Sequence, residues 1–213
     1  MKTEILLIRH GQSEGNLQHV FCGQTDVALT ETGRKQAEVT AEYLKDRNID
    51  RFYSSPLSRA YETALAAAKY HGKTVEKIEQ IAEIYGGEWE NVSFEEIKAK
   101  YPEELRVWNE CIGKSRCPGG ESPTDVQERV YPAFESLAKG NEGKTLCVAA
   151  HGMVIRVFAA KILGISMEKL DSLPWAPNAS VTTVEYENGG FRLVEHGYSD
   201  HLAELVTTFP DKI

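Results

Sequence analysis

Two short apolar runs, each ending in a histidine and a glycine, constrain the fold of this chain most. The runs are residues 5–8 and 146–150, and the segments that follow them are Arg9-His10-Gly11 and His151-Gly152. A short apolar run is typical of a strand buried on both faces of a parallel sheet. Because ligands of open α/β sheets bind at the carboxyl ends of the strands, we expect both imidazoles to lie at one active site.

Hydrophobic periodicity predicts alternating strands and helices. Strands are predicted at residues 5–8, 51–54, 75–78 and 145–150, with an edge hairpin at residues 181–186 and 191–194. Helices are predicted at about 31–46, from an N-cap at Ser55-Pro56, from Ser93 to before Pro102, at 103–110, from Ser122-Pro123 onward and at about 153–163.

This order of elements predicts an α/β fold, a three-layer α/β/α sandwich with a mainly parallel mixed sheet. We expect residues 1–213 to form a single domain. Segment 86–120, which carries Trp89, Tyr101 and Trp108, is predicted to be a helical insertion that forms a lid over the sheet.

Composition narrows the classes of partner and site. The chain has 24 Lys and Arg against 32 Asp and Glu, a net charge of −8, which opposes sequence-independent binding to nucleic acid or anionic lipid. The apolar run after Met1 is too short for a signal peptide or a membrane span, so we expect a cytoplasmic enzyme. The cysteines form no C-x-x-C pair, and the spacing of His196 and His201 matches no standard metal site. We therefore expect reduced thiols and no metal.

Five residues suited to phosphate chemistry follow predicted strand ends: Arg9, His10, Arg59, Glu83 and His151. Transfer from a phosphate ester needs a nucleophile, cations for the phosphoryl oxygens and an acid for the leaving oxygen. Arginine suits phosphate because its planar fork donates two parallel hydrogen bonds and stays charged. The alternative is that the arginines form ordinary salt bridges and that Glu83 is a solvated surface charge.

Three ordered motifs resemble those of a known family. They are LLIRHGQSEGN at residues 6–16, GQTDVALTETG at 23–33 and SSPLSRAYET at 54–63. The resemblance continues through Glu83 with GEWE at 87–90, PGGES at 118–122 and AHG at 150–152. The chain thus resembles the histidine phosphatase superfamily, in its phosphoglycerate mutase-like branch, over nearly its whole length.

The resemblance implies a covalent phosphohistidine mechanism with His10 as the nucleophile. A neutral imidazole nitrogen would attack phosphorus while a backbone carbonyl holds the proton of the other nitrogen. Glu83 would protonate the leaving alkoxide and then deprotonate the attacking water. A phosphate dianion beside this carboxyl raises its pKa, so we expect the enzyme to favour mildly acidic conditions.

The same resemblance assigns the remaining site residues and requires neither a metal nor a cofactor. Arg9, Arg59 and His151 would bind the transferring phosphoryl group, and Asn16 would add a neutral donor. The further substrate-binding positions are Cys22, Gly23 and Gly152. The expected partner is a small-molecule phosphomonoester, and a homodimer is possible.

The family contains both mutases and phosphatases, and three readings stay open. Cofactor-dependent mutases usually carry tryptophan and asparagine where this chain has Gly15 and Met153, and an arginine pair where its insertion has isolated Lys114 and Arg116. Fewer cations hold a bisphosphorylated intermediate less firmly, which favours a phosphatase. The alternatives are a 2,3-bisphosphoglycerate-dependent phosphoglycerate mutase and a non-catalytic module that binds phosphorylated ligands.

Overall fold

A computed structural model of the chain describes residues 1–208 and 213. Its main sheet has six strands in the order β4-β3-β6-β1-β7-β8. Their bounds are β1 Thr3–Arg9, β3 Arg51–Ser54, β4 Val75–Lys77, β6 Thr145–Ala150, β7 Val181–Glu187 and β8 Gly190–Tyr198. Strands β4, β3, β6 and β1 are parallel, whereas β7 and β8 form an antiparallel hairpin at the edge. The predicted mixed sheet and its edge hairpin are confirmed.

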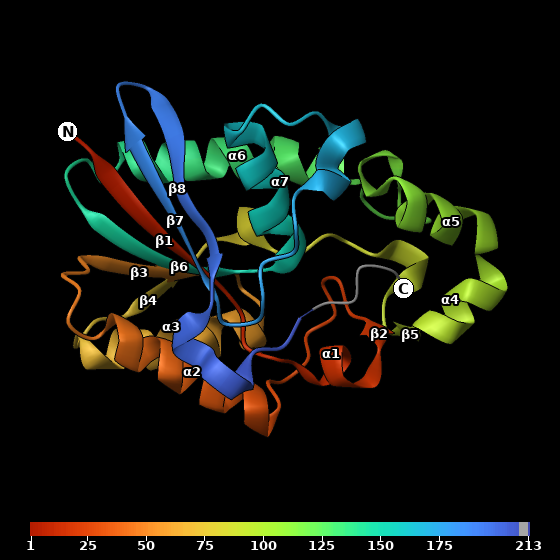
Figure 1. Cartoon of the computed structure of the whole chain (residues 1–213), viewed down its shortest axis with the longest axis horizontal. Coiled ribbons are helices and arrows are strands. Elements are labelled where there is room, and N and C mark those ends of the chain that lie inside the picture. The colour runs from red at the N-terminus through yellow and green to blue at the C-terminus, as the bar shows by residue number, and fades with distance from the viewer. Residues whose placement is uncertain (209–212) are drawn as a thin grey trace.

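Helices cover both faces of this sheet (Figure 1). Helices α2 (Glu31–Leu44) and α3 (Ser58–Tyr70) pack on one face, and α6 (Pro123–Lys139) and α7 (Gly152–Ile162) pack on the other. Successive side chains of β1 alternate between the two cores, because Leu6 and Ile8 join one cluster and Ile5 and Leu7 the other. Each such fully buried aliphatic side chain contributes about 1.5–3 kcal/mol. The predicted three-layer sandwich is confirmed.

Of the three helix N-caps predicted at serine residues, two are confirmed. Capping boxes open α4 (Phe94–Lys100) at Ser93 and α6 at Ser122, the latter with proline in its first turn. The third prediction is wrong, because α3 begins at Ser58 and Ser55 is not its N-cap. The carboxylate of Asp26, from a distant loop, accepts the hydrogen bond from the Ser58 N–H instead (2.8 Å). A tertiary contact thus satisfies a helix end that the local sequence assigns to Ser55.

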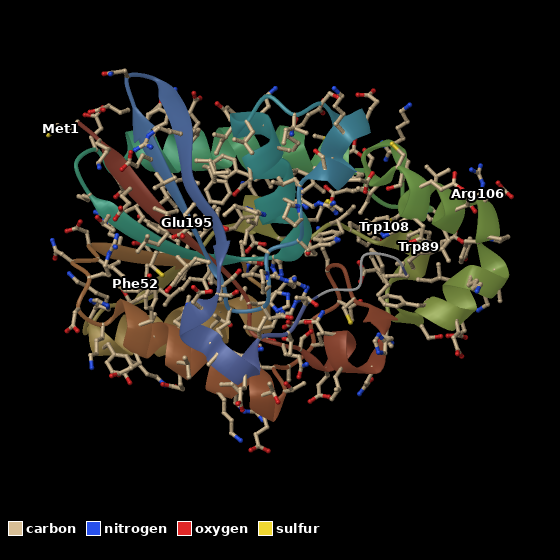
Figure 2. The ribbon with its side chains drawn as sticks, in the orientation of Figure 1. Met1, Phe52, Trp89, Arg106, Trp108 and Glu195 are labelled. Atoms are coloured by element: carbon tan, nitrogen blue, oxygen red, sulfur yellow. The ribbon has the colours of Figure 1, made fainter. Side chains whose placement is uncertain are left out.

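Segment 86–120 contains short helices that pack against an early loop. Its elements are η2 Gly87–Trp89, β5 Val92–Ser93, α4, α5 Pro102–Glu110 and η3 Ile112–Lys114. Strand β5 pairs with β2 (Val20–Phe21), and Trp89 and Trp108 lie side by side with ring centroids 5.6 Å apart (Figure 2). Phe21 contacts both indoles edge-on. These aromatic contacts fix the insertion beside the carboxyl ends of the strands.

The remaining described elements are short. They are α1 Glu14–Gln18, η1 Glu79–Ile81, η4 Met167–Ser172 and η5 Asp200–Leu205. Gly11 lies so close to α2 that a Cβ there would approach the carbonyl oxygen of Gly33 to 2.3 Å, which requires glycine in the loop after β1. No helix within residues 1–208 combines the length and apolar character needed to cross a bilayer.

Candidate active site

A pocket opens at the carboxyl ends of the central strands, and most of the predicted site residues line it. The non-atom space between its lining residues is about 550 Å³, a value that includes open solvent at the mouth. The predicted residues in its lining are Arg9, His10, Asn16, Cys22, Gly23, Arg59, Glu83 and Gly152. His151 is fully buried outside this lining, but its ring centroid lies 5.2 Å from that of His10. The fold therefore brings all nine residues to one place.

His10 lies directly after β1 with one ring nitrogen held by the backbone. Its Nδ1 lies 2.7 Å from the carbonyl oxygen of Gly11, so Nδ1 carries the proton and Nε2 keeps a lone pair. Within the described residues Nε2 makes no hydrogen bond. Burial, with the nearby charges of Arg59 and Arg9, holds the pKa of His10 well below its usual 6.5. The ring is therefore neutral near pH 7, with a lone pair available on Nε2.

Arg9 and Arg59 enter the pocket with no carboxylate in salt-bridge contact among the described residues. Arg9 donates from Nη1 to the carbonyl oxygen of Ala176 (2.6 Å), and its buried Nε has no partner. Arg59 donates to the carbonyl oxygens of Thr25 and Gly23 at 2.9 and 2.6 Å. Burial lowers the pKa of Arg9 to about 10, which leaves the guanidinium charged. Within residues 1–208, neither arginine forms the ordinary salt bridge of the alternative interpretation, and the polar partners given above are carbonyl oxygens.

Asn16 reaches the pocket with only its donor group free. Its Oδ1 accepts hydrogen bonds from the backbone N–H and hydroxyl of Ser13, each at 3.1 Å, and lies 3.3 Å from Nδ2 of Asn178. The Asn178 amide also donates to the carbonyl oxygen of His10 (3.0 Å). These contacts orient the Asn16 NH₂ toward the pocket as a neutral donor. Asn178 holds two site residues together, a role that the sequence interpretation did not assign.

The loop that carries Cys22 and Gly23 is held by Glu90. One oxygen of the Glu90 carboxylate accepts hydrogen bonds from the N–H groups of Gln24 (2.8 Å) and Gly86 (2.7 Å), and the other accepts that of Thr25 (2.8 Å). Gly23 has a positive φ of 39°, and a Cβ there would lie 2.1 Å from the same carboxylate. Glycine is therefore required at this turn.

Glu83 faces the pocket with each carboxylate oxygen held by a backbone N–H. Oε1 accepts from Ile84 at 2.9 Å, and Oε2 accepts from Met153, in the first turn of α7, at 3.3 Å. Burial raises the pKa of Glu83, and these hydrogen bonds and the charges of Arg59 and Arg9 offset the rise only in part. The alternative of a solvated surface charge is wrong, because Glu83 is half-buried in the pocket lining and backbone N–H groups hold both carboxylate oxygens.

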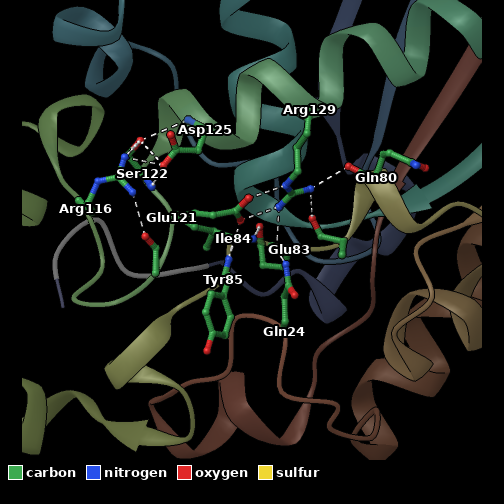
Figure 3. Close-up of polar contacts among 12 residues, drawn as sticks. Gln24, Gln80, Glu83, Ile84, Tyr85, Arg116, Glu121, Ser122, Asp125 and Arg129 are labelled. Carbon is green, nitrogen blue, oxygen red and sulfur yellow. Dashed lines mark hydrogen bonds and ion pairs between the residues drawn. The ribbon is translucent and has the colours of Figure 1, made fainter.

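An arginine from α6 holds the backbone beneath Glu83 (Figure 3). Arg129 donates to the carbonyl oxygens of Gln80, Ala82 and Glu83 at 2.7–2.9 Å. It also forms a two-point contact with the carboxylate of Glu121, which in turn accepts the N–H of Tyr85 (2.8 Å). We call Arg129 and Glu121 the Arg129 clamp. The sequence interpretation missed this clamp because it joins residues 80–85 to side chains that lie 36–49 positions further along the chain.

The pocket combines buried cationic groups with donors that lack partners. Arg9 Nε and His151 Nδ1 are both buried and unbonded among the described residues. A buried donor without an acceptor costs free energy. Because these two nitrogens lie near the charges of Arg9 and Arg59, an anion bound there would supply the missing acceptors. Within residues 1–208, no group of three or more metal-ligating side chains is placed to hold a metal ion.

The profile of the histidine phosphatase superfamily (branch 1) matches residues 5–199, and the chain belongs to this superfamily. It is similar to phosphoserine phosphatase 1 of Hydrogenobacter thermophilus, with 34% identity over 95% of this chain and 96% of that protein. A 2,3-bisphosphoglycerate-dependent phosphoglycerate mutase of a Chelativorans species is also 34% identical, over 80% of this chain and 86% of the mutase. The chain is also similar to the solved structure of YhfR from Bacillus stearothermophilus, with a TM-score of 0.90 and 28% identity. The match covers 94% of this chain and 99% of the YhfR chain.

Proposed function

We propose that this enzyme is a phosphatase that hydrolyses small phosphomonoesters through a phosphohistidine formed on His10. The observation that carries the proposal is the state of the His10 ring, whose Nδ1 is held by the Gly11 carbonyl and whose Nε2 is free. The relative named phosphoserine phosphatase, similar over nearly the full length of both chains, supports the same reaction class.

In the first step the lone pair of His10 Nε2 attacks phosphorus as the bond from phosphorus to the ester oxygen breaks. Glu83 gives its proton to that oxygen, and an alcohol leaves; burial favours this role because it raises the pKa of the carboxyl. Arg9 and Arg59 offset the charge on the phosphoryl oxygens, and the Asn16 amide donates a neutral hydrogen bond. A phosphorylated imidazole and an ionised Glu83 remain.

In the second step Glu83 takes a proton from water, and the water oxygen attacks phosphorus. The bond between phosphorus and Nε2 breaks, its electron pair returns to the imidazole, and inorganic phosphate leaves. Glu83 is protonated again, so the enzyme is ready for a further cycle. Glu83 thus donates the proton in the first step and accepts one from water in the second.

Two features favour hydrolysis over mutase activity. In the described residues the pocket lining contains two cationic side chains, Arg9 and Arg59, whereas Arg116 of the insertion pairs with Asp125 outside the pocket. A Cβ on Gly15 would lie 2.1 Å from the sulfur of Cys22, so the tryptophan usual in mutases would have to displace Cys22. The site therefore suits one phosphoryl group rather than two.

The organic part of the substrate would lie against Phe21, Ile84, Trp108 and Met153. These side chains suit an ester with some apolar or sugar character. We propose a cytoplasmic enzyme whose partner is this small molecule and, given the net charge of −8, neither nucleic acid nor a membrane. Homodimer formation stays a prediction.

The decisive experiment traps the intermediate. The enzyme turns over p-nitrophenyl phosphate without added metal, is quenched in alkali and digested, and the peptide that contains His10 is examined by mass spectrometry for an added phosphoryl group. We expect phosphorylated His10 in the wild type, and neither adduct nor turnover in His10→Ala. His71→Ala is the matched control, because the cap at the end of α3 is made by the backbone N–H of His71, and its ring packs on Phe52 outside the pocket lining.

Three outcomes would change the assignment. Turnover with no adduct on His10 would remove the covalent mechanism, and lack of activity on a broad ester panel would favour a binding module. Incubation with 3-phosphoglycerate and 2,3-bisphosphoglycerate separates the enzyme classes. Rapid isomerisation stimulated by the bisphosphate would establish the mutase instead.

A further inference from the structure

His151 contacts a serine that the proposed reaction does not use. Ser55 follows β3 directly, and its Oγ lies 2.7 Å from Nε2 of His151. Both side chains have an exposed fraction of zero. A hydrogen bond this short between buried groups fixes the orientation of the imidazole.

The surroundings of Ser55 decide which atom donates. The backbone N–H of Leu57 donates to Ser55 Oγ at 3.3 Å, so this oxygen already accepts one hydrogen bond. In the described residues the only other partner of the hydroxyl is His151 Nε2. If Nε2 donated, the hydroxyl proton would be buried without an acceptor, which is costly. The hydroxyl therefore donates to Nε2.

This direction sets the tautomer of a neutral ring. Burial and the charge of Arg59 hold the pKa of His151 well below 6.5, so the imidazole carries one proton near pH 7. With Nε2 accepting from Ser55, that proton lies on Nδ1. His151 Nδ1 is buried and has no partner in the described part of the chain.

We propose that Ser55 is a positioning residue that holds His151 in the Nδ1–H tautomer, so that this proton is available to a phosphoryl group on the neighbouring His10. The inference rests on the proposed function, because it assigns the acceptor of the unpaired Nδ1–H to the phosphoryl oxygens. Ser55 acts only through His151. It lies outside the pocket lining.

The chain contains a matched control in the adjacent residue. Ser54, the last residue of β3, is equally buried, and its hydroxyl has no hydrogen-bond partner. Ser54→Ala therefore removes the same atoms from the same strand end without affecting His151. Ser55→Thr keeps a hydroxyl at the position that Ser55→Ala empties.

The kinetic test compares these three variants with p-nitrophenyl phosphate. We expect Ser55→Ala to lower kcat/KM about tenfold, the scale of one lost buried hydrogen bond. Ser54→Ala should match the wild type, and Ser55→Thr should recover most of the loss. Equal losses in Ser54→Ala and Ser55→Ala would show a packing effect and overturn the proposal. Thermal melting checks that each variant is folded.

A spectroscopic test does not depend on turnover. The enzyme is prepared with ¹⁵N-labelled histidine, and long-range proton–nitrogen correlations identify the protonated nitrogen of His151, assigned by comparison with His151→Gln. We expect Nδ1–H in the wild type and in Ser54→Ala, and a mixed or Nε2–H form in Ser55→Ala. An Nε2–H ring in the wild type would overturn the inference even with full phosphatase activity. Conversely, the enzyme could lack phosphatase activity while His151 keeps the Nδ1–H tautomer. That result would contradict the proposed function but still support the role of Ser55 in fixing the tautomer.

Discussion

Two walls of the pocket are built in opposite ways. Among the residues that line the pocket, we call Arg9, His10, Asn16 and Arg59 the polar wall, and Phe21, Ile84, Trp108 and Met153 the apolar wall. On the polar wall, hydrogen bonds to backbone or side-chain groups fix each side chain and leave chosen atoms free. On the apolar wall, the contacts of Phe21 and Trp108 are aromatic packing.

This difference indicates which properties each wall controls. Hydrogen bonds are directional, so the polar wall defines where the phosphoryl oxygens and the attacking nitrogen lie. Apolar contact is roughly proportional to buried area and has little directional preference. We therefore expect changes near the polar wall to lower the rate for every ester, and changes in the apolar wall to alter the choice among esters.

Replacing Glu83 by glutamine gives the largest effect, because the amide keeps the shape but cannot carry the proton. We expect kcat for an alkyl phosphate to fall by about 10²–10⁴-fold. p-Nitrophenolate leaves without a proton, so this variant should show a burst of one product per site followed by slow hydrolysis of phosphohistidine. Stopped-flow absorbance measures both phases. Glu88→Gln is the control, since its carboxylate contacts only the Tyr101 hydroxyl among the described residues.

The pH profile tests the same carboxyl. The reactive form of Glu83 is protonated and its pKa is raised, so kcat/KM should fall as the pH rises through that pKa. His10 has a lowered pKa, so the neutral nucleophile persists into mildly acidic solution. A rate that still climbs above about pH 9 would contradict the acid role of Glu83.

Changing the Arg129 clamp should lower the rate by an intermediate amount, because Arg129 contacts the backbone of Glu83 and not the substrate. Arg129→Lys keeps the charge but cannot reach three carbonyl oxygens and Glu121 together. We expect kcat about tenfold lower for all esters. Looser packing admits water to Glu83, which lowers its pKa toward the ordinary value and moves the alkaline limb to lower pH. Arg106→Lys is the control, since Arg106 pairs with exposed Glu103 and Glu110. If the alkaline side of the pH–rate profile does not move, the clamp stabilises the fold but does not tune the pKa of Glu83.

The sequence predicted the elements whose signals are local. The apolar run 145–150 coincides with β6, and the cap at Ser122-Pro123 opens α6 as expected. The positions of His10, His151 and Glu83 followed from strand ends and from the family motifs. The missed features are contacts between distant segments. Ser55 meets a histidine 96 residues away, and Arg129 reaches a carbonyl 49 residues away. No local pattern marks such partners, because they depend on how the layers pack.

The smallest expected effect tests the apolar wall and separates it from the polar one. Trp108→Phe keeps an aromatic ring beside Phe21 and Trp89 but removes part of the surface offered to the substrate. We expect the KM for 1-naphthyl phosphate to rise about three- to tenfold, the scale of a few lost apolar contacts. The KM for a small alkyl phosphate should change little, and kcat should equal that of the wild type for both esters. Tyr43→Phe is the control, because that ring stacks on His201 outside the pocket. Steady-state kinetics on the two esters decides the matter. An equal change for both would show that this wall also supports the reacting groups, and the division between the walls would fail.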